Sequence, residues 1–306
     1  MINKTSPDFL LNPFEIGNLN GVLTLNNLLY PDHPSSLESM HHHEKTRSQK
    51  ILHKHFVWEK NNMILCSALY TQWEDAYHPQ KFVINVIVHP DHQGLGYGTF
   101  CYDLLLKEIK IFDPIKISAQ VYELHKQSVH FLEKRGYKNT IEERESILDL
   151  TSYNSHLYQN KIDRVLQHGF RIVTLSEFRR EYNNADYKAW ELERDVGPDM
   201  PWTDPITIPE FEVYKKRIFS HPKFNPDSWF FILNGNEIVG MNNLWESEIN
   251  KGIETGLTGV SREYRRKGVA TALKHTGLAW AKNNGYESIR TDNVATNEGM
   301  LNINIQ

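Results

Sequence analysis

Two short glycine-containing turns are the residues of this sequence with the clearest chemical potential. The first reads Gln93-Gly94-Leu95-Gly96-Tyr97-Gly98-Thr99, and the second reads Arg265-Arg266-Lys267-Gly268-Val269-Ala270-Thr271. Glycine has no Cβ, so successive backbone N–H groups at such a turn can point into one concavity. Because a helical pattern follows each turn, the unpaired N–H groups of that helix add further donors. The combination can hold a pyrophosphate group.

Three interpretations of these turns compete. A single turn of this kind is compatible with a tight strand-to-helix connection that binds no ligand. A dinucleotide site requires Gly-x-Gly-x-x-Gly and an acidic residue about 20 positions later. That spacing is absent here, because the first turn has Gly94-x-Gly96-x-Gly98 and the second keeps only Gly268. The third interpretation is a turn that holds the pyrophosphate of coenzyme A.

The elements that must position the turns occur twice in the chain. Val88 and Gly96 of the first copy correspond to Val260 and Gly268 of the second, at a constant separation of 172 positions. In both copies a strand-like segment precedes the turn and a helical pattern follows it. The separation far exceeds the roughly 20–50 residues of stacked repeats, so the pattern indicates duplication of a whole domain.

The duplication predicts two domains, residues 1–150 and 170–306. An apolar hairpin lies upstream of each turn, at residues 55–70 and 229–241. We expect the strand-like residues 146–150 to close the first domain, with a polar helical linker after them. The second copy has no counterpart of that strand, so we expect its closing strands to be missing from this sequence.

The composition is that of an ordinary globular protein and narrows the classes of function. Of the 306 residues, 40% are hydrophobic and 24% are charged, with a net charge of -4. These values argue against disorder and give no basic footprint for nucleic acid. Cys66 and Cys101 lie in apolar runs, which favours a reducing compartment. No signal peptide or apolar run of about 18 residues is present, so we expect a soluble cytoplasmic protein without nucleic-acid or membrane partners.

Both halves resemble the GNAT superfamily of N-acetyltransferases. The family signature, Gln/Arg-x-x-Gly-x-Gly/Ala after the fourth strand, is matched by residues 93–98 and 265–270. A second family element is a helix with Asn-x-x-Ala and a Tyr seven positions after the Asn. At these positions the first half has His125, Ser128 and Leu132, and the second has Asn297, Met300 and Asn304. The tandem arrangement resembles that of mycothiol synthase, in which the C-terminal repeat does the chemistry.

The resemblance implies an α/β chain of the α+β GNAT type, with two tandem domains that each contain a mixed, mostly antiparallel sheet flanked by helices. It also implies acetyl-CoA as co-substrate, with its pantetheine arm paired along the fourth strand. A main-chain N–H near Val88 or Val260 would then bond the thioester carbonyl. The implied donor-binding residues are Val88, Gln93, Gly94, Leu95, Gly96, Tyr97, Gly98, Thr99, Val260, Arg265, Arg266, Lys267, Gly268, Val269, Ala270, Thr271 and Asn297.

Catalysis requires a base that removes a proton from the acceptor amine near neutral pH. Glu254 lies on the strand leading to Val260, and the two positions differ by an even number, so alternation predicts that they share a face. The alternative is a solvated carboxylate at a strand start. Asn304 stands where the family has its acid, a Tyr. An amide can bond a sulfur but does not readily transfer a proton, and Leu132 cannot donate at all.

Residues 190–202 lie where the family shapes its acceptor pocket, and they combine carboxylates with tryptophans. They either attract and cover an amine or form a solvated helix followed by a proline-rich turn. We expect an acetyl-CoA-dependent N-acetyltransferase that acts on a small-molecule amine in the second domain. The first domain then binds an acyl-CoA or serves as a structural partner. The alternative is a non-catalytic acyl-CoA-binding sensor or scaffold. Consecutive histidines on a helix point in different directions, so residues 41–43 predict no metal site.

Overall fold

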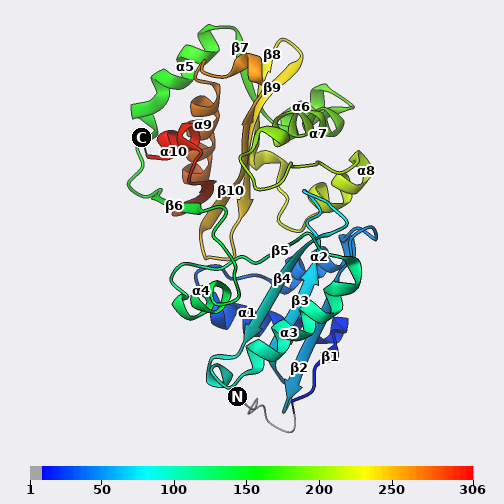
Figure 1. Ribbon diagram of the computed structural model, residues 1–306. Coiled ribbons are helices and arrows are strands. Elements are labelled where there is room, and N and C mark those ends of the chain that lie inside the picture. The colour runs from blue at the N-terminus through cyan, green and yellow to red at the C-terminus, as the bar shows by residue number, and fades with distance from the viewer. Residues whose placement is uncertain (1–8, 306) are drawn as a thin grey trace. The chain divides into compact units, whose positions relative to one another are not determined.

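The computed structural model describes residues 9–305 of the chain, which forms two compact units, Met1–Asn139 and Thr140–Gln306. The first unit contains a five-stranded sheet in the order β1-β2-β3-β4-β5 (Figure 1). Strands β1 to β4 are antiparallel, and β5 is parallel to β4. Its elements are β1 (Asn12–Pro13), α1 (Leu19–Leu29), α2 (Leu37–Thr46), β2 (Lys54–Lys60), β3 (Met63–Thr71), β4 (Lys81–Val88), α3 (Tyr97–Ile109), β5 (Lys116–Ser118) and α4 (Lys126–Glu133).

Both faces of the first sheet are buried. Trp58 of β2 packs in the cluster that includes Leu105 of α3. Its neighbour Val57 packs on the opposite face, with Val22 and Leu25 of α1. Because the sheet is covered on both sides, its strands are apolar runs rather than alternating patterns.

The second unit contains a six-stranded sheet in the order β6-β11-β10-β9-β8-β7. All neighbouring strands are antiparallel except the parallel pair β10 and β11. Its elements are β6 (Glu143–Asp149), α5 (Gln159–Gln167), β7 (Phe170–Thr174), α6 (Leu175–Glu181), α7 (Ala185–Val196), α8 (Phe211–Tyr214), β8 (Trp229–Asn234), β9 (Glu237–Glu246), β10 (Gly252–Val260), α9 (Val269–Asn283), β11 (Ser288–Val294) and α10 (Glu298–Ile305).

Helices cover both faces of the second sheet as well (Figure 1). Phe230 of β8 packs in one cluster with Leu273 of α9 and Val165 of α5. Its neighbour Phe231 packs on the other face, with Phe178 of α6 and residues of α7. The sheet therefore separates an α5–α9 face from an α6–α7 face.

The strand predicted to close the first sheet belongs to the second sheet instead. Strand β6 pairs antiparallel with β11 over seven registered positions, from Glu143 opposite Val294 to Asp149 opposite Ser288. The strand pattern itself was detectable, but it does not specify which sheet edge the strand joins. The first sheet ends at β5.

The predicted fold class is confirmed, since each unit has a mixed, mostly antiparallel sheet flanked by helices. The predicted hairpins are present as β2–β3 and β8–β9. In the described residues, no helix combines the length and the apolar character needed to cross a membrane. Cys66 and Cys101 are both buried and carry no disulfide.

Candidate functional site

The two predicted turns follow the same backbone path. After the strand comes a 3₁₀ turn, η2 (Pro90–His92) in the first unit and η8 (Arg262–Tyr264) in the second. The helix then begins after a glycine in the left-handed region, where Gly96 has φ 94° and Gly268 has φ 81°. Glycine is favoured there because other residues clash at Cβ. These two glycines therefore fix the start of α3 and α9.

A second left-handed position precedes each of these glycines. It is occupied by Gly94 with φ 74° in the first turn and by Arg266 with φ 63° in the second. An arginine in this region carries a conformational cost of about 1 kcal/mol. The shape of the turn therefore persists in the second unit even though this glycine is replaced.

The first residue of each turn braces the turn against its own strand. Gln93 Nε2 donates to the carbonyl oxygen of Val88 at 3.0 Å, and Arg265 Nε donates to that of Val260 at 2.8 Å. Both side chains belong to the predicted donor-binding set, and the structure shows them bonded to the protein itself. The backbone N–H groups of the turn remain the natural anion-binding groups.

The last strand residue before each turn directs its N–H away from the antiparallel neighbour. In the second unit, the N–H of Ser261 donates to the carbonyl of Val239 on β9 at 2.9 Å. Backbone N–H groups alternate between the two edges of a strand, so the N–H of Val260 points to the other edge. His89 makes the equivalent bond to β3 at 2.8 Å, so the same holds for Val88.

On that other edge, the parallel strands separate. Strands β10 and β11 are in register only at residues 252–254 of β10, and β4 and β5 only at residues 81–83 of β4. Beyond these points, residues 255–260 and 84–88 have no registered partner on the parallel neighbour. Each unit thus offers an unpaired strand edge that leads to its glycine turn, and an extended ligand can pair with such an edge.

A β-bulge shapes β10 within this region. Strand β10 has one more residue than β9 between Thr255 and Thr258. Two buried asparagines of β9 hold the bulge: Asn243 Oδ1 accepts from the N–H of Leu257 at 2.6 Å, and Asn242 Oδ1 accepts from the Thr258 hydroxyl at 2.7 Å. Because these side chains replace the missing ladder bonds, the bulge is a built feature of the sheet.

The bulge corrects the predicted orientation of Glu254. Ile253 and Val260 pack in the same cluster on the α5–α9 face although they are seven positions apart. Glu254 is registered opposite Trp245, which packs on the α6–α7 face. Glu254 and Val260 therefore lie on opposite faces, and the prediction of a shared face was wrong because the extra residue reverses the alternation.

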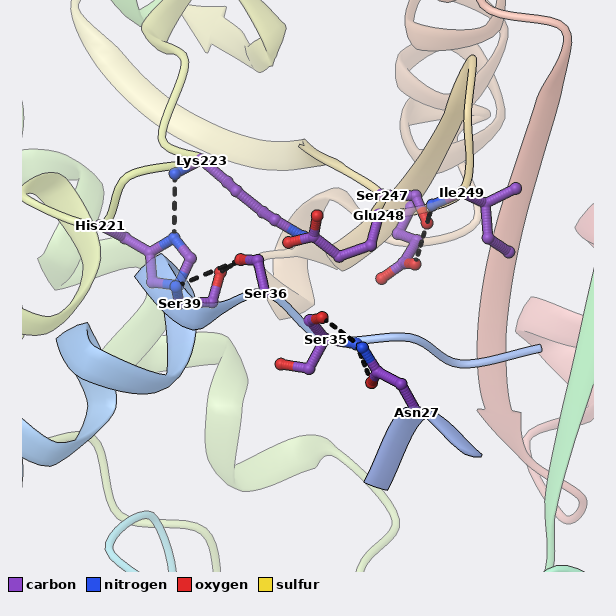
Figure 2. Close-up of polar contacts among 10 residues, drawn as sticks. Asn27, Ser35, Ser36, Ser39, His221, Lys223, Ser247, Glu248 and Ile249 are labelled. Atoms are coloured by element: carbon purple, nitrogen blue, oxygen red, sulfur yellow. Dashed lines mark hydrogen bonds and ion pairs between the residues drawn. The ribbon is translucent and has the colours of Figure 1, made fainter. Parts of the chain in front are cut away.

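Glu254 is held by the loop between β9 and β10, part of which is drawn in Figure 2. The Ser247 hydroxyl donates to Glu254 Oε1 at 2.7 Å, and its oxygen accepts from the N–H of Ile249 at 3.2 Å. In the same loop, Glu248 forms an ion pair with Lys223 Nζ at 2.6 Å. The half-buried Glu254 carboxylate thus has a fixed position on the α6–α7 face.

The predicted second-motif residues lie at the start and end of α10. Asn297 Oδ1 accepts from the N–H of Met300 at 3.2 Å, which is a helix N-capping bond. Asn304 Nδ2 donates to Asn293 Oδ1 on β11. The Asn297 side chain therefore caps α10, and the Asn304 side chain ties α10 to β11.

Asp199, a carboxylate of the predicted acceptor stretch, bonds to the second turn, which the sequence did not indicate. It ends the 3₁₀ turn η5 (Gly197–Asp199), which follows α7. Its carboxylate accepts from Arg262 Nε at 2.9 Å and from Arg265 Nη2 at 2.5 Å. Hydrogen bonds from Arg262 and then from Arg265 lower the pKa of Asp199 to about 2. This carboxylate is ionised at any physiological pH.

The two turns differ in charge. Residues 262–267 carry three arginines, one lysine and one glutamate, whereas residues 90–95 carry one aspartate and no lysine or arginine. At the position of Lys267, the first turn has Leu95, which is 47% exposed. Within the turn segments themselves, only the second carries lysine or arginine; at the first turn, Arg135 from the segment after α4 donates to the Thr99 hydroxyl at 3.1 Å.

The stretch at residues 190–202 is largely occupied with internal contacts. Trp190 is buried, and its Nε1 donates to the carbonyl of Pro209 at 2.8 Å. Glu193 accepts from the hydroxyl of the buried Tyr214 at 2.5 Å. With Asp199 bound to two arginines, three side chains of this stretch are used to fix the segment that follows α7 rather than left open to an amine.

A surface hollow of about 520 Å³ in the first unit is lined by none of the turn residues. Its lining comes from the segment before α1 and from α2, as Phe14, Ile16, His41, His42, Glu44 and Lys45. Among the described residues, no group of three His, Cys, Asp or Glu side chains is placed to hold a metal ion. The unpaired strand edges and their turns thus remain the sites with organised chemistry.

Solved structures share the fold of the whole chain. A tandem GNAT protein from the clavulanic acid biosynthesis pathway has a TM-score of 0.70 and 14% identity, with 97% of this chain and 93% of that chain covered. A GCN5-related N-acetyltransferase from Sphaerobacter thermophilus has a TM-score of 0.66 and 14% identity, with 96% and 89% covered. A glucosamine N-acetyltransferase region in a fungal multi-domain GH3 beta-N-acetylglucosaminidase has a TM-score of 0.66 and 13% identity, with 92% of this chain and 35% of that chain covered. At these identities the likeness shows the fold alone.

No curated protein matches the chain in sequence. The model of the acetyltransferase (GNAT) family matches twice, at residues 22–137 and at residues 189–303. Each match contains one strand edge and one glycine turn. The chain therefore belongs to the GNAT family of N-acetyltransferases, with two GNAT regions in tandem.

Proposed function

We propose that this chain transfers an acetyl group from acetyl-CoA to the amine of a small molecule, with the reaction in the second unit. The family typically uses acetyl-CoA. The observation that carries the proposal is the unpaired edge of β10, which ends in the outward N–H of Val260 and continues into the turn at Gly268. An extended pantetheine arm can pair along this edge, and the diphosphate next to it in the donor can reach the turn that follows the edge.

The residues of the second unit supply the binding and the proton transfer. The N–H groups of residues 266–271 and the cationic side chains of the turn would hold the diphosphate. The N–H of Val260 would stabilise the developing oxyanion when the amine nitrogen attacks the carbonyl carbon. The C–N bond forms as the C–S bond breaks, and the proton lost by the ammonium goes to Glu254 through a chain of waters, because several residues of β10 separate Glu254 from Val260.

The α6–α7 face is the acceptor side in this proposal. Glu254 lies on that face, and the segment after α7 is fixed there by its internal bonds. The acceptor amine therefore reaches the thioester through the separated strands from that side. No side chain need reprotonate the sulfur, because a thiol with a pKa of about 8.5 leaves tolerably as the thiolate. We assign Asn304 a supporting role through β11.

The test of this proposal is the variant Glu254→Gln. We expect it to lower kcat by about 10²- to 10³-fold, because a general base contributes about that much, and to leave the affinity for acetyl-CoA unchanged. The exposed Glu237→Gln on β9 is the control for the loss of one charge. Turnover is followed by release of free thiol from acetyl-CoA. Equal loss of turnover and donor affinity in Glu254→Gln would remove Glu254 as the base.

The acceptor is to be found with a panel of small amines. Glucosamine belongs in the panel because one structural neighbour is a glucosamine N-acetyltransferase region. From mycothiol synthase we carry over only the tandem architecture. The first unit, whose turn has the same backbone but no lysine or arginine of its own, would bind an acyl-CoA more weakly or serve as a structural partner. The cytoplasmic location stays a prediction.

The alternative function is a non-catalytic acyl-CoA sensor or scaffold. It is favoured by the absence of the family's tyrosine, since Leu132 and Asn304 stand at its two positions. Tight acetyl-CoA binding in calorimetry, without thiol release beyond the buffer rate across the whole panel, would support the sensor. Amine-dependent release that Glu254→Gln reduces would support the enzyme.

A further inference from the structure

Asp199 joins the segment after α7 to the second turn. Its carboxylate receives hydrogen bonds from Arg262 and Arg265, which lie 63 and 66 positions later in the chain. Arg265 also donates through Nε to the carbonyl of Val260. The guanidinium group of Arg265 is therefore held at two points, by the strand end and by Asp199, as a planar fork of donors can be.

The backbone beneath Asp199 is packed directly on β10. A Cβ on Gly259 would lie 2.6 Å from Val196 Cγ2, so only glycine permits the observed approach of α7 to the strand. Gly197, which follows Val196 in the chain, is buried, and a Cβ on Gly197 would lie 3.1 Å from Ile208 Cδ1. The carboxylate of Asp199 is thus carried by a segment whose distance from the strand end is fixed.

The first turn is braced to its strand without any carboxylate like Asp199 beside it. Gln93 makes the same bond to its strand with a neutral amide, which requires no counter-ion. An arginine at this position brings a charge next to three other basic side chains of the turn. A fixed carboxylate offsets that repulsion and orients the guanidinium group.

We propose that Asp199 is a positioning residue for donor binding, which acts through Arg265 to hold the second turn in the geometry that binds the diphosphate. This inference rests on the proposed function, because the diphosphate is that of acetyl-CoA. Asp199 touches neither the donor nor the acceptor in this role. Its removal should therefore weaken donor binding and leave the chemical step intact.

The first test measures acetyl-CoA binding by calorimetry and turnover by thiol release. We expect Asp199→Asn to raise the Kd and the KM for acetyl-CoA by about 10-fold, as for the loss of a charge-assisted pair, with kcat lowered less than about 2-fold. The control is Glu212→Gln, an exposed residue of α8, which makes the same change in net charge. It should leave the Kd unchanged. Thermal melting of each variant verifies that it is folded.

The chain itself supplies the second test, because Gln93 is the natural replacement for Arg265. In Arg265→Gln the neutral amide can brace the strand as Gln93 does. Adding Asp199→Asn to that variant should then raise the Kd by less than about 2-fold. An equally large effect in both backgrounds would show that Asp199 does not act through Arg265 and would overturn the proposal. Tighter binding in Asp199→Asn would mean that the only effect of Asp199 is its negative charge near the diphosphate, and this too would overturn the proposal.

A ligand-free measurement separates this proposal from the proposed function. Amide hydrogen exchange of residues 261–269 should become faster in Asp199→Asn and stay as in the wild type in Glu212→Gln. If the wild type binds no acetyl-CoA, the proposed function fails, and the exchange rates still report whether Asp199 braces the turn. Unchanged exchange in Asp199→Asn would overturn the bracing itself.

Discussion

The two glycine turns of this chain have the same backbone and different charges. Both place left-handed residues at equivalent positions and brace their first side chain against the preceding strand. The second turn adds four basic side chains and the carboxylate of Asp199, whereas the first adds one aspartate and no lysine or arginine. The comparison separates two requirements for binding a diphosphate. The backbone supplies the shape, and other side chains supply the field.

The largest expected effect comes from a carboxylate placed in each turn. Gly268→Glu should lower the affinity for acetyl-CoA at least about 100-fold, because it strains a left-handed position and repels the diphosphate. Gly96→Glu makes the same change in the first turn. Calorimetry should show that it leaves the tighter binding event in place. A larger loss in Gly96→Glu would move the main donor site to the first unit.

A smaller effect is expected from a difference between the helices that follow the turns, α9 and α3. His275 of α9 is buried, its Nδ1 lies 3.0 Å from the Tyr153 hydroxyl, and its ring stacks on Tyr158 at 4.0 Å. The equivalent position on α3 is the exposed Asp103. Burial, then the charges of nearby lysines, lowers the pKa of His275 to about 4.

The sign of the resulting pH dependence follows from proton uptake. Because the unfolded state binds the His275 proton near pH 6.5 and the folded state only near 4, this histidine stabilises the fold above pH 6.5 and loses that contribution as the pH falls toward 4. Between pH 7 and pH 5 the wild type should lose on the order of 1–2 kcal/mol more than His275→Gln. Urea unfolding at the two pH values measures the difference. Equal losses would show that His275 is not the titrating group.

One basic side chain of the second turn can be introduced at the equivalent position of the first turn. Leu95→Lys copies Lys267 at an exposed position, so it should raise the affinity of the first unit for acetyl-CoA about 3- to 5-fold at low salt, through one added surface charge. Binding is best measured in the Gly268→Glu background, where the second turn is disabled. The increase should disappear at about 1 M salt, where the Debye length is about 3 Å. An increase that persists at high salt would have a cause other than charge.

The smallest change, in Arg266→Gly, tests the shape of the turn. Arg266→Gly should stabilise the second unit by about 0.5 kcal/mol, because it relieves a left-handed arginine while adding freedom to the unfolded chain. Gly94→Ala should destabilise the first unit by about 1 kcal/mol for the same steric reason. Chemical denaturation measures both changes. If Arg266→Gly destabilises, the arginine side chain contributes more through its contacts than its backbone costs.

Most of the fold was predictable because its signals are local. The glycine spacing located both turns, and the apolar segments around Val88 and Val260 located the strands before them. The hairpins were readable from Asn61-Asn62 and from Gly235, which adopt positive φ values in the structure. Each of these signals depends on residues within a few positions of one another, so one sequence sufficed.

The rest depends on contacts between distant residues. The bulge in β10 appears only when the residues of β9 are counted opposite it, so alternation alone placed Glu254 on the wrong face. The link from Asp199 to Arg265 spans 66 positions. An aspartate in a polar stretch gives no sign of such a partner.

The pairing of β6 with β11 has a practical consequence for dissecting the protein. A fragment that starts at β7 would keep the second glycine turn but leave one edge of β11 bare, with its main-chain groups available to another molecule. Such a fragment would be prone to self-association, and a negative result from it would say nothing about catalysis. A fragment of the second half should therefore start no later than Thr140, so that it includes strand β6.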